Sequence, residues 1–219
     1  GRVSSVRITE IKETKKGRYA LFCDGEFLFS IDDETLSRHR IRVGCELGNE
    51  SLMQLRAASD YQSAKNKAFD LLALRDHSVH ELQMKLERKF DPHTAQLAVE
   101  KVGELGLLDD GRFASRYAAE LVERRGSSVR AAAAKLREKG IDKQIIEEVL
   151  DPYKESEMER IKALIDKKYS GKLVGKQGRE AVFASLARRG FSPSVIRAEL
   201  SNIEEDDITR DDYFDDGEY

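Results

Sequence analysis

Basic side chains recur in this chain at a fixed spacing of 50 residues, inside three similar phrases that contain Leu86, Leu136 and Leu186. Like charges at one repeated position form a stripe. A stripe of cations suits a polyanion or an acidic protein groove, because each neutralised phosphate releases counterions. The alternative is a solvated helix face whose cations stabilise helix C-termini. The side chains expected to form the stripe are Arg75, Lys85, Arg88, Lys89, Arg125, Lys135, Lys139, Arg188 and Arg189.

The other reactive residue types form no catalytic or metal-binding pattern in the sequence. No carboxylate or cysteine cluster accompanies the four histidines to complete a metal site. Cys23 and Cys45 fit neither a disulfide framework nor a zinc pattern, so both are expected to be reduced. Residues 171–177 differ from a phosphate-binding loop, because three residues rather than four separate the glycines and Gln177 replaces the metal-binding Ser or Thr. The sequence therefore predicts no enzymatic activity, no metal and no cofactor.

The repeated cations must be positioned by a repeated unit of helices. A fixed period indicates one supersecondary unit used three times, each packing on the next. The second helix of each unit is expected to start at an equivalent capping position, namely Ser78, Ser128 or Gly178. In the last two units it ends beside Gly140 or Gly190, since glycine closes a helix at low cost. The positions expected to face inward are Leu82, Leu86, Ala132, Leu136, Val182 and Leu186 on the second helix, and Ala95, Val99, Ile146, Leu150, Ile196 and Leu200 on the third.

The N-terminal part of the chain follows a different pattern. Asp24-Gly25 stands between two apolar runs, which is the strongest short signal for a β-hairpin. We therefore expect about three antiparallel strands, followed by a short helix that begins with the acidic residues 32–34. From Asn49 the apolar spacing becomes helical. This segment is either one long helix to about Arg75 or two helices broken near Ser59.

Charge is distributed unevenly along the chain. The formal net charge is −3, but residues 204–219 alone carry −8, which leaves +5 on the rest. Such a tail repels itself and has little apolar surface to bury, so it is expected to be disordered. It would either solubilise the protein or compete with an anion for the basic body. No apolar run approaches the roughly 18 residues that span a membrane, and no apolar leader is present, so the chain is expected to be cytoplasmic without a membrane partner.

Together these patterns predict a mainly α protein. It is expected to be an elongated, curved, tandem array of three three-helix-bundle repeats, with a small antiparallel β-hairpin region at the N-terminus. The expected boundaries are 1–48 for the β-rich region, 49–108 for a linker helix and repeat 1, 109–152 for repeat 2, 153–203 for repeat 3 and 204–219 for the disordered acidic tail. Such an array offers a long surface rather than a pocket, which favours binding over catalysis.

Three groups of residues resemble the bacterial RecX regulators. Residues 68–86 match the first repeat of that family, an apolar helix ending in Arg, followed by Ser and then by Glu-Leu and Lys-Leu. The segment Leu107-Leu108-Asp109-Asp110, with Phe113 and Tyr117, is also similar. The two phrases that end in Lys-Gly or Arg-Gly followed by an apolar residue are similar to the family as well.

The resemblance extends over residues 50–203, and the β-rich front resembles an extension found in some members. Two features depart from the family pattern, the acidic tail and the missing glycine after Lys89. The resemblance implies a non-enzymatic regulator of the recombinase RecA, acting in DNA recombination, DNA repair and the SOS response. Family members bind RecA and its filament on single-stranded DNA, bridge protomers across the helical groove, and inhibit filament growth, strand exchange and RecA ATPase activity.

The expected partners are therefore RecA and the RecA–single-stranded DNA filament, with weak direct binding of DNA as a further expectation and a monomer as the expected state. Two other readings stay open on the residues alone. One is a helix-turn-helix-like DNA-binding protein, although the second helix holds mostly Lys and Glu rather than the Arg, Asn or Gln that pair with base edges. The other is a helical-repeat scaffold for a different protein.

Overall fold

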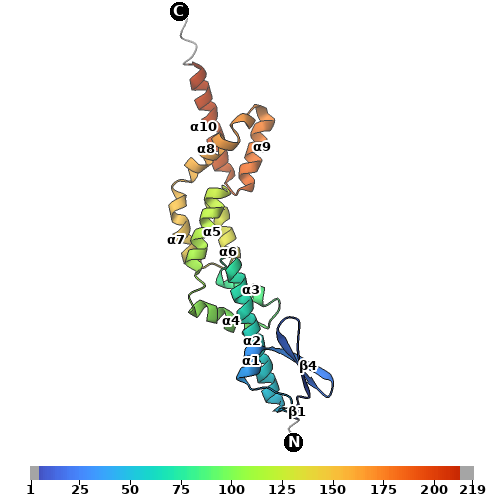
Figure 1. Cartoon of the computed structure of the whole chain (residues 1–219). Coiled ribbons are helices and arrows are strands. Elements are labelled where there is room, and N and C mark those ends of the chain that lie inside the picture. Colours follow the sequence, from blue (N-terminus) through green and yellow to red (C-terminus); the bar gives the residue numbers. More distant parts are fainter. Residues whose placement is uncertain (1–4, 213–219) are drawn as a thin grey trace, which may run out of the picture. The chain divides into compact units, whose positions relative to one another are not determined.

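The structure, a computed structural model, describes the backbone of residues 5–212 and divides into two compact units, residues 1–109 and 110–219 (Figure 1). Helices dominate both units, and the described residues contain ten α-helices. All the strands that the structure describes lie in the first unit. The predicted class, mainly α with a small antiparallel β region, is confirmed.

The N-terminal region forms two small antiparallel sheets. Strands β2 (Glu10–Glu13), β3 (Arg18–Cys23) and β4 (Glu26–Asp32) make one sheet in that order, and β1 (Ser5–Arg7) pairs with β5 (Glu46–Gly48) in the other. Positive φ angles of 49° at Asp24 and 84° at Gly25 close the predicted hairpin. Helix α1 (Asp33–Arg38) follows, and the Asp32 carboxylate caps it by accepting from the Thr35 amide at 2.8 Å. The predicted hairpin and short helix are therefore confirmed.

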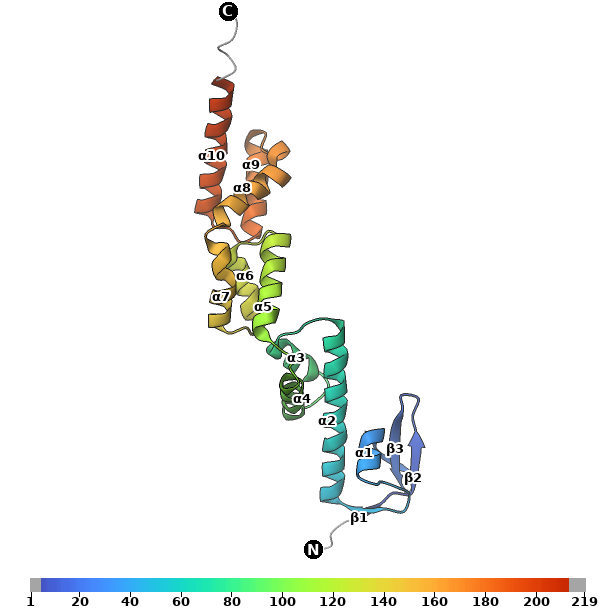
Figure 2. The same ribbon diagram turned by 60° about the vertical axis from the view of Figure 1, so that its left-hand side comes forward.

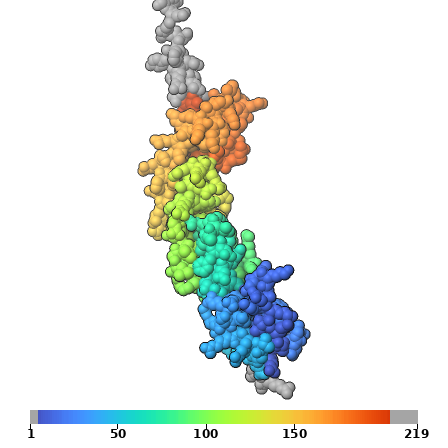
Figure 3. All heavy atoms as spheres, viewed as in Figure 1, coloured from blue at the N-terminus to red at the C-terminus, as the bar shows by residue number. Residues whose placement is uncertain are grey.

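Helix α2 runs unbroken from Asn49 to Leu74, which decides between the two predicted alternatives (Figure 2). Its N-terminal part covers the sheet, and Leu55 joins a core with Ile8, Leu21 and Ile31. Ser59 is buried and does not break the helix, because it takes part in a hydrogen-bond network with the sheet. The Arg18 guanidinium donates to Ser59 Oγ at 3.1 Å and to the Ser30 carbonyl at 2.7 Å. In the space-filling view the hairpin (dark blue) and the start of α2 (light blue) form one packed body (Figure 3).

Repeat 1 consists of the C-terminal part of α2 with α3 (Val79–Leu86) and α4 (Pro92–Glu104). Repeat 2 consists of α5 (Asp110–Ala119), a π-helical turn η1 (Glu120–Arg124), α6 (Val129–Glu138) and α7 (Lys143–Lys154). Repeat 3 consists of α8 (Glu157–Lys168), a 3₁₀ turn η2 (Ser170–Lys172), α9 (Gly175–Arg188) and α10 (Pro193–Asp212).

Each repeat has a hydrophobic core of its own. The second helices start as predicted in the first two repeats, where the Ser78 and Ser128 hydroxyls accept from the Glu81 and Ala131 amides at 3.0 and 3.1 Å. The inward positions of the second and third helices are confirmed as core, with Leu200 partly buried and the others buried. These buried positions are Leu82, Leu86, Ala95, Val99, Ala132, Leu136, Ile146, Leu150, Val182, Leu186 and Ile196.

The second helix of repeat 3 departs from the prediction. It begins at Gly175, after Val174, so Gly178 lies inside α9 rather than at its cap. A Cβ atom at Gly178 would stand 2.2 Å from the carbonyl oxygen of Lys172. Glycine at this position therefore lets the preceding turn approach α9 closely. It has no side-chain oxygen, so it cannot cap the helix as Ser78 and Ser128 do.

The acidic segment also differs from its prediction over residues 204–212, where α10 continues as a helix to Asp212. Once a helix is nucleated, each further residue adds a hydrogen bond at little entropic cost, and glutamate is a good helix former. Residues 213–219 of the predicted tail lie outside the described residues. Among the described helices, none is long and apolar enough to cross a lipid bilayer.

Repeats 2 and 3 are joined within the second unit by hydrogen bonds in which at least one partner is a backbone group. The Ser128 amide donates to the Arg189 carbonyl at 2.9 Å, and the Arg130 guanidinium donates to the Gly190 carbonyl at 3.2 Å. The Val129 amide donates to the Glu157 carboxylate at 2.7 Å. The end of α9 and the first residue of α8 thus lie against the start of α6, and they accept from two amides that a helix N-terminus leaves without intrahelical partners.

Candidate basic binding surface

Most of the predicted cations lie near the C-terminal end of the second helix of a repeat. Lys85 is in the last turn of α3, Lys135 in the last turn of α6 and Arg188 in the last turn of α9. Cations stabilise the negative end of the helix dipole in this position. Position alone therefore does not distinguish a cation that binds a partner from one that stabilises its helix, whereas the contacts of each side chain do.

In repeat 1, two of the predicted cations contact a buried histidine and a carboxylate. Arg75 pairs bidentately with Glu81, with both N···O distances at 2.8 Å. Lys85 Nζ lies 2.9 Å from Nε2 of His77, which is 2% exposed. The His77 Nδ1 atom is 3.0 Å from the Arg75 carbonyl oxygen, so Nδ1 donates to it and Nε2 accepts from the lysine. Arg75 and Lys85 therefore have a structural role in this repeat.

The buried His77 predicts a pH-dependent stability of the protein. Burial lowers the pKa of His77 below its ordinary 6.5, and the positive charges of Arg75 and Lys85 act in the same direction. The unfolded chain binds a proton near pH 6.5, whereas the folded chain does so only at lower pH. The free energy of unfolding is therefore expected to fall as the pH drops below about 6.5 and to level off once His77 is protonated in the folded state.

Urea denaturation between pH 7.5 and 5 measures this effect, and His77→Gln should flatten the profile. The matched control is His80→Gln, which changes an exposed histidine three residues away. If both variants keep the wild-type profile, His77 does not contribute to the pH dependence.

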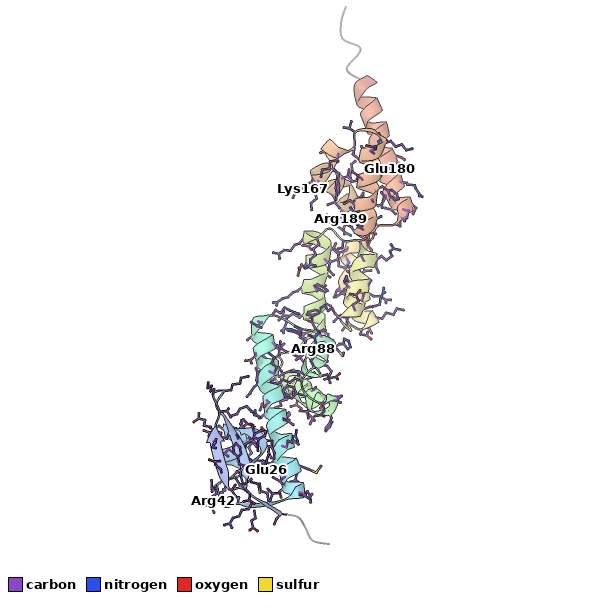
Figure 4. All side chains as sticks on the ribbon, turned by 90° about the vertical axis from the view of Figure 1, so that its right-hand side faces the viewer. Glu26, Arg42, Arg88, Lys167, Glu180 and Arg189 are labelled. Carbon is purple, nitrogen blue, oxygen red and sulfur yellow. The ribbon has the colours of Figure 1, made fainter. Side chains whose placement is uncertain are left out.

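Arg88, labelled in Figure 4, differs from these residues because its side chain is exposed. Among the residues that the structure describes, it has no hydrogen-bond or ion-pair partner. Lys89 is also exposed, with Nζ 5.6 Å from the centre of the Phe90 ring, a cation–π contact. Arg88 and Lys89 are thus available at the surface of repeat 1.

The predicted cations of repeat 2 are partly neutralised by their neighbours. Arg125 forms an ion pair with Glu120. Lys135 pairs with Glu138 at 2.9 Å, and this hydrogen bond raises the pKa of Lys135. Lys139 Nζ lies 6.0 Å from the centre of the Tyr117 ring. Repeat 2 therefore presents less uncompensated charge than the spacing of its basic residues suggests.

In repeat 3 the two predicted arginines differ in their surroundings. Arg188 is exposed, and the described part of the chain offers it no polar partner. Arg189 lies at the junction with repeat 2, where its guanidinium donates to the Arg125 carbonyl and its own carbonyl accepts from the Ser128 amide (Figure 4). Arg88 and Arg188, at equivalent positions of repeats 1 and 3, are the predicted cations best placed to contact a partner.

The structure also shows a basic hollow that was not predicted from the sequence. It lies between η1 of repeat 2 and α8 of repeat 3, and Arg124, Arg160, Lys167 and Lys168 contribute to its lining. The pairs Arg124-Arg125 and Lys167-Lys168 near the ends of first helices were the available sequence signal. In the described residues, no group of three or more His, Cys, Asp or Glu side chains could hold a metal ion.

Three family models match this chain. The model for the regulatory protein RecX N-terminal domain matches residues 6–48, and those for the first and second three-helix domains of RecX match residues 64–101 and 109–150. A solved chain described as the regulatory protein RecX superposes with a TM-score of 0.61 at 23% identity, covering 90% of this chain and 99% of that one. This similarity supports the fold.

Curated relatives from several bacteria carry the name regulatory protein RecX. The protein from Halorhodospira halophila is 34% identical over 154 residues, which are 69% of this chain and 94% of that protein. The protein from Lactobacillus johnsonii is 29% identical over 92% of this chain and 78% of its own length. The Bacillus subtilis protein is 27% identical over 90% and 77%. RecX proteins are regulators rather than enzymes, and this chain belongs to the RecX family.

Proposed function

We propose that this protein binds RecA and the RecA filament on single-stranded DNA and inhibits filament growth, RecA ATPase activity and strand exchange. The RecX family regulates RecA, which gives the partner. The observation that carries the proposal is the equivalence of Arg88 and Arg188, two exposed arginines at the same helix end of two similar repeats. Equivalent cations on the first and third repeats, with Glu138 at that position of the second, suit a partner that is itself periodic and anionic, as a nucleoprotein filament is.

The test is a titration of this protein into RecA assembled on single-stranded DNA, with ATP hydrolysis and strand exchange followed in parallel. Both rates are expected to fall as the protein approaches an equimolar ratio to RecA. Unchanged rates at that ratio would remove the proposal. Binding to duplex DNA of one particular sequence would instead favour a helix-turn-helix-like regulator.

The contacts in repeat 1 decide which residues should be changed. Reversing the charge of Lys85 would place a carboxylate against buried His77, so a loss of inhibition could come from unfolding. Arg88 and Arg188 avoid this difficulty, because both are exposed and contact no polar partner in the described residues.

The double variant Arg88→Glu/Arg188→Glu is expected to keep its helix content. Half-maximal inhibition of the RecA ATPase should require roughly tenfold more of the variant than of the wild type, because each exposed ion pair contributes up to about 1 kcal/mol and charge reversal adds repulsion. The effect should shrink at high salt, which screens exposed charges. Arg42→Glu/Arg56→Glu is the matched control, with the same change of net charge at two exposed arginines that do not belong to the predicted stripe. Equal inhibition by both double variants would contradict the assignment of Arg88 and Arg188.

A further inference from the structure

The hollow between repeats 2 and 3 has a volume of about 320 Å³, within the size range of small-ligand sites. Four cationic side chains line it, Arg124, Arg160, Lys167 and Lys168, against one carboxylate, Glu123. We propose that this hollow is a phosphate-binding site formed jointly by two repeats.

Arg160 is fixed in the wall of the hollow by contacts within the chain. Its Nη1 atom donates to the Tyr153 carbonyl at 2.7 Å and to Ser156 Oγ at 2.8 Å, and the guanidinium carbon lies 5.5 Å from the centre of the Tyr153 ring. Its Nη2 atom is buried and has no hydrogen-bond partner in the described part of the chain. Buried donors of charged groups are nearly always paired in proteins, because leaving one unpaired is costly. Because the protein encloses Nη2, a ligand in the hollow would be held by the positive charge of Arg160 rather than by a hydrogen bond from this atom.

The two carboxylates whose charges act on Arg160 accept hydrogen bonds from other groups. Glu157 accepts from the Val129 amide at 2.7 Å, and Glu123 accepts from the Tyr153 hydroxyl at 2.7 Å. Burial lowers the pKa of Arg160 from its ordinary value, and the charge of Glu157 opposes that shift. An arginine remains protonated despite such a shift, so the hollow keeps a partly buried positive charge without a direct ion pair among the described residues.

The balance of charge favours phosphate over a single carboxylate. Four cations and one acid give the lining an excess of three positive charges. A phosphate monoester carries about −1.5 to −2 at neutral pH and offers three acceptor oxygens, so it can engage several donors at once. Arginine forks and lysine ammonium groups are the usual phosphate-binding side chains. The π-helical turn η1 forms one wall of the hollow, and such turns occur frequently at functional sites.

The phosphate could be free, part of a mononucleotide, or part of a single-stranded DNA backbone. Apolar side chains, among them Val122, Leu164 and Phe191, line the same hollow and would accommodate a sugar or base beside the phosphate. Only the DNA source rests on the proposed function. Binding of phosphate itself can be tested without RecA.

The experiment uses the ¹⁵N-labelled full chain, titrated with inorganic phosphate, thymidine 5′-monophosphate and a short oligothymidylate at constant ionic strength. Saturable amide shifts are expected at Gly126, Ala163 and Leu164, which line the hollow. Lys167→Gln/Lys168→Gln should weaken phosphate binding roughly fivefold to tenfold, as expected for the loss of two exposed charge pairs. If the oligonucleotide shifts the same amides as phosphate does, the DNA backbone is a source of the bound phosphate. A response confined to the two small anions would identify free phosphate or a nucleotide as the ligand.

The control is Lys162→Gln, which removes an exposed lysine from the same helix α8 but outside the hollow. Its phosphate affinity should equal that of the wild type. Arg160→Gln is the second variant, with circular dichroism to verify folding, and should lose saturable binding. The proposal fails if phosphate produces no saturable shift, or if Lys162→Gln weakens binding as much as the double variant. Either result leaves RecA inhibition unaffected, so the two proposals fail separately.

Discussion

Replacing Gly190 by alanine is expected to destabilise the unit of residues 110–219 by about 2 to 5 kcal/mol, from backbone strain and overpacking together. Gly190 has a φ of +93°, a conformation that L-residues rarely adopt. A Cβ atom there would stand 2.5 Å from the Ala131 Cβ atom and 2.6 Å from Ser128 Oγ. Both neighbours belong to the start of α6, so the added methyl group would push repeats 2 and 3 apart.

Urea denaturation followed by circular dichroism measures the loss, and hydrogen exchange locates it. The Ser128 amide donates to the Arg189 carbonyl at this junction, so its exchange should accelerate more than that of amides in the core of α6. Gly103→Ala is the control, because Gly103 lies in α4 and a Cβ atom there would meet nothing within 4 Å beyond its chain neighbours and the nearby backbone of its own helix. That variant should gain up to about 1 kcal/mol from helix propensity. A neutral Gly190→Ala would show that the junction adjusts freely.

The regular features of the fold were predictable because they depend on local sequence. The hairpin at Asp24-Gly25 follows from turn chemistry, and the caps at Ser78 and Ser128 follow from a side-chain oxygen at the right position. Gly178 does not cap its helix, although the 50-residue spacing makes it equivalent to Ser78 and Ser128. Its role depends on the Lys172 carbonyl, which approaches it through a turn whose path the periodicity does not specify.

The candidate site was predictable in residue type but not in the partners of each residue. The spacing of the cations located Arg88 and Arg188 at the surface, yet it could not show that Arg189 contacts the carbonyl of Arg125, 64 residues away. Nor could it show that Lys85 contacts buried His77. Arg160 was not predictable as a site residue for a related reason, since its role depends on a hollow that two repeats line together. Long-range packing decides which cations remain available.

Leu136→Ala is the second variant with a large expected effect, a loss of about 2 to 5 kcal/mol in the free energy of unfolding, as for other buried leucine truncations. Leu136 is 0% exposed and belongs to the core of repeat 2 with Phe113, Ile146 and Leu150. A three-helix unit of this size has few such residues, so the cavity cannot be filled by distant side chains.

The control for this variant is Leu74→Ala, which removes the same atoms from a leucine that is 81% exposed at the end of α2. It should change stability by no more than about 0.5 kcal/mol, as surface substitutions usually do. Leu186→Ala tests the equivalent core position of repeat 3, also 0% exposed. Because hydrogen bonds join repeats 2 and 3 at Ser128 and Arg189, both core variants should lower the exchange protection of the Ser128 amide, and protection that survives in both would show that the repeats unfold independently.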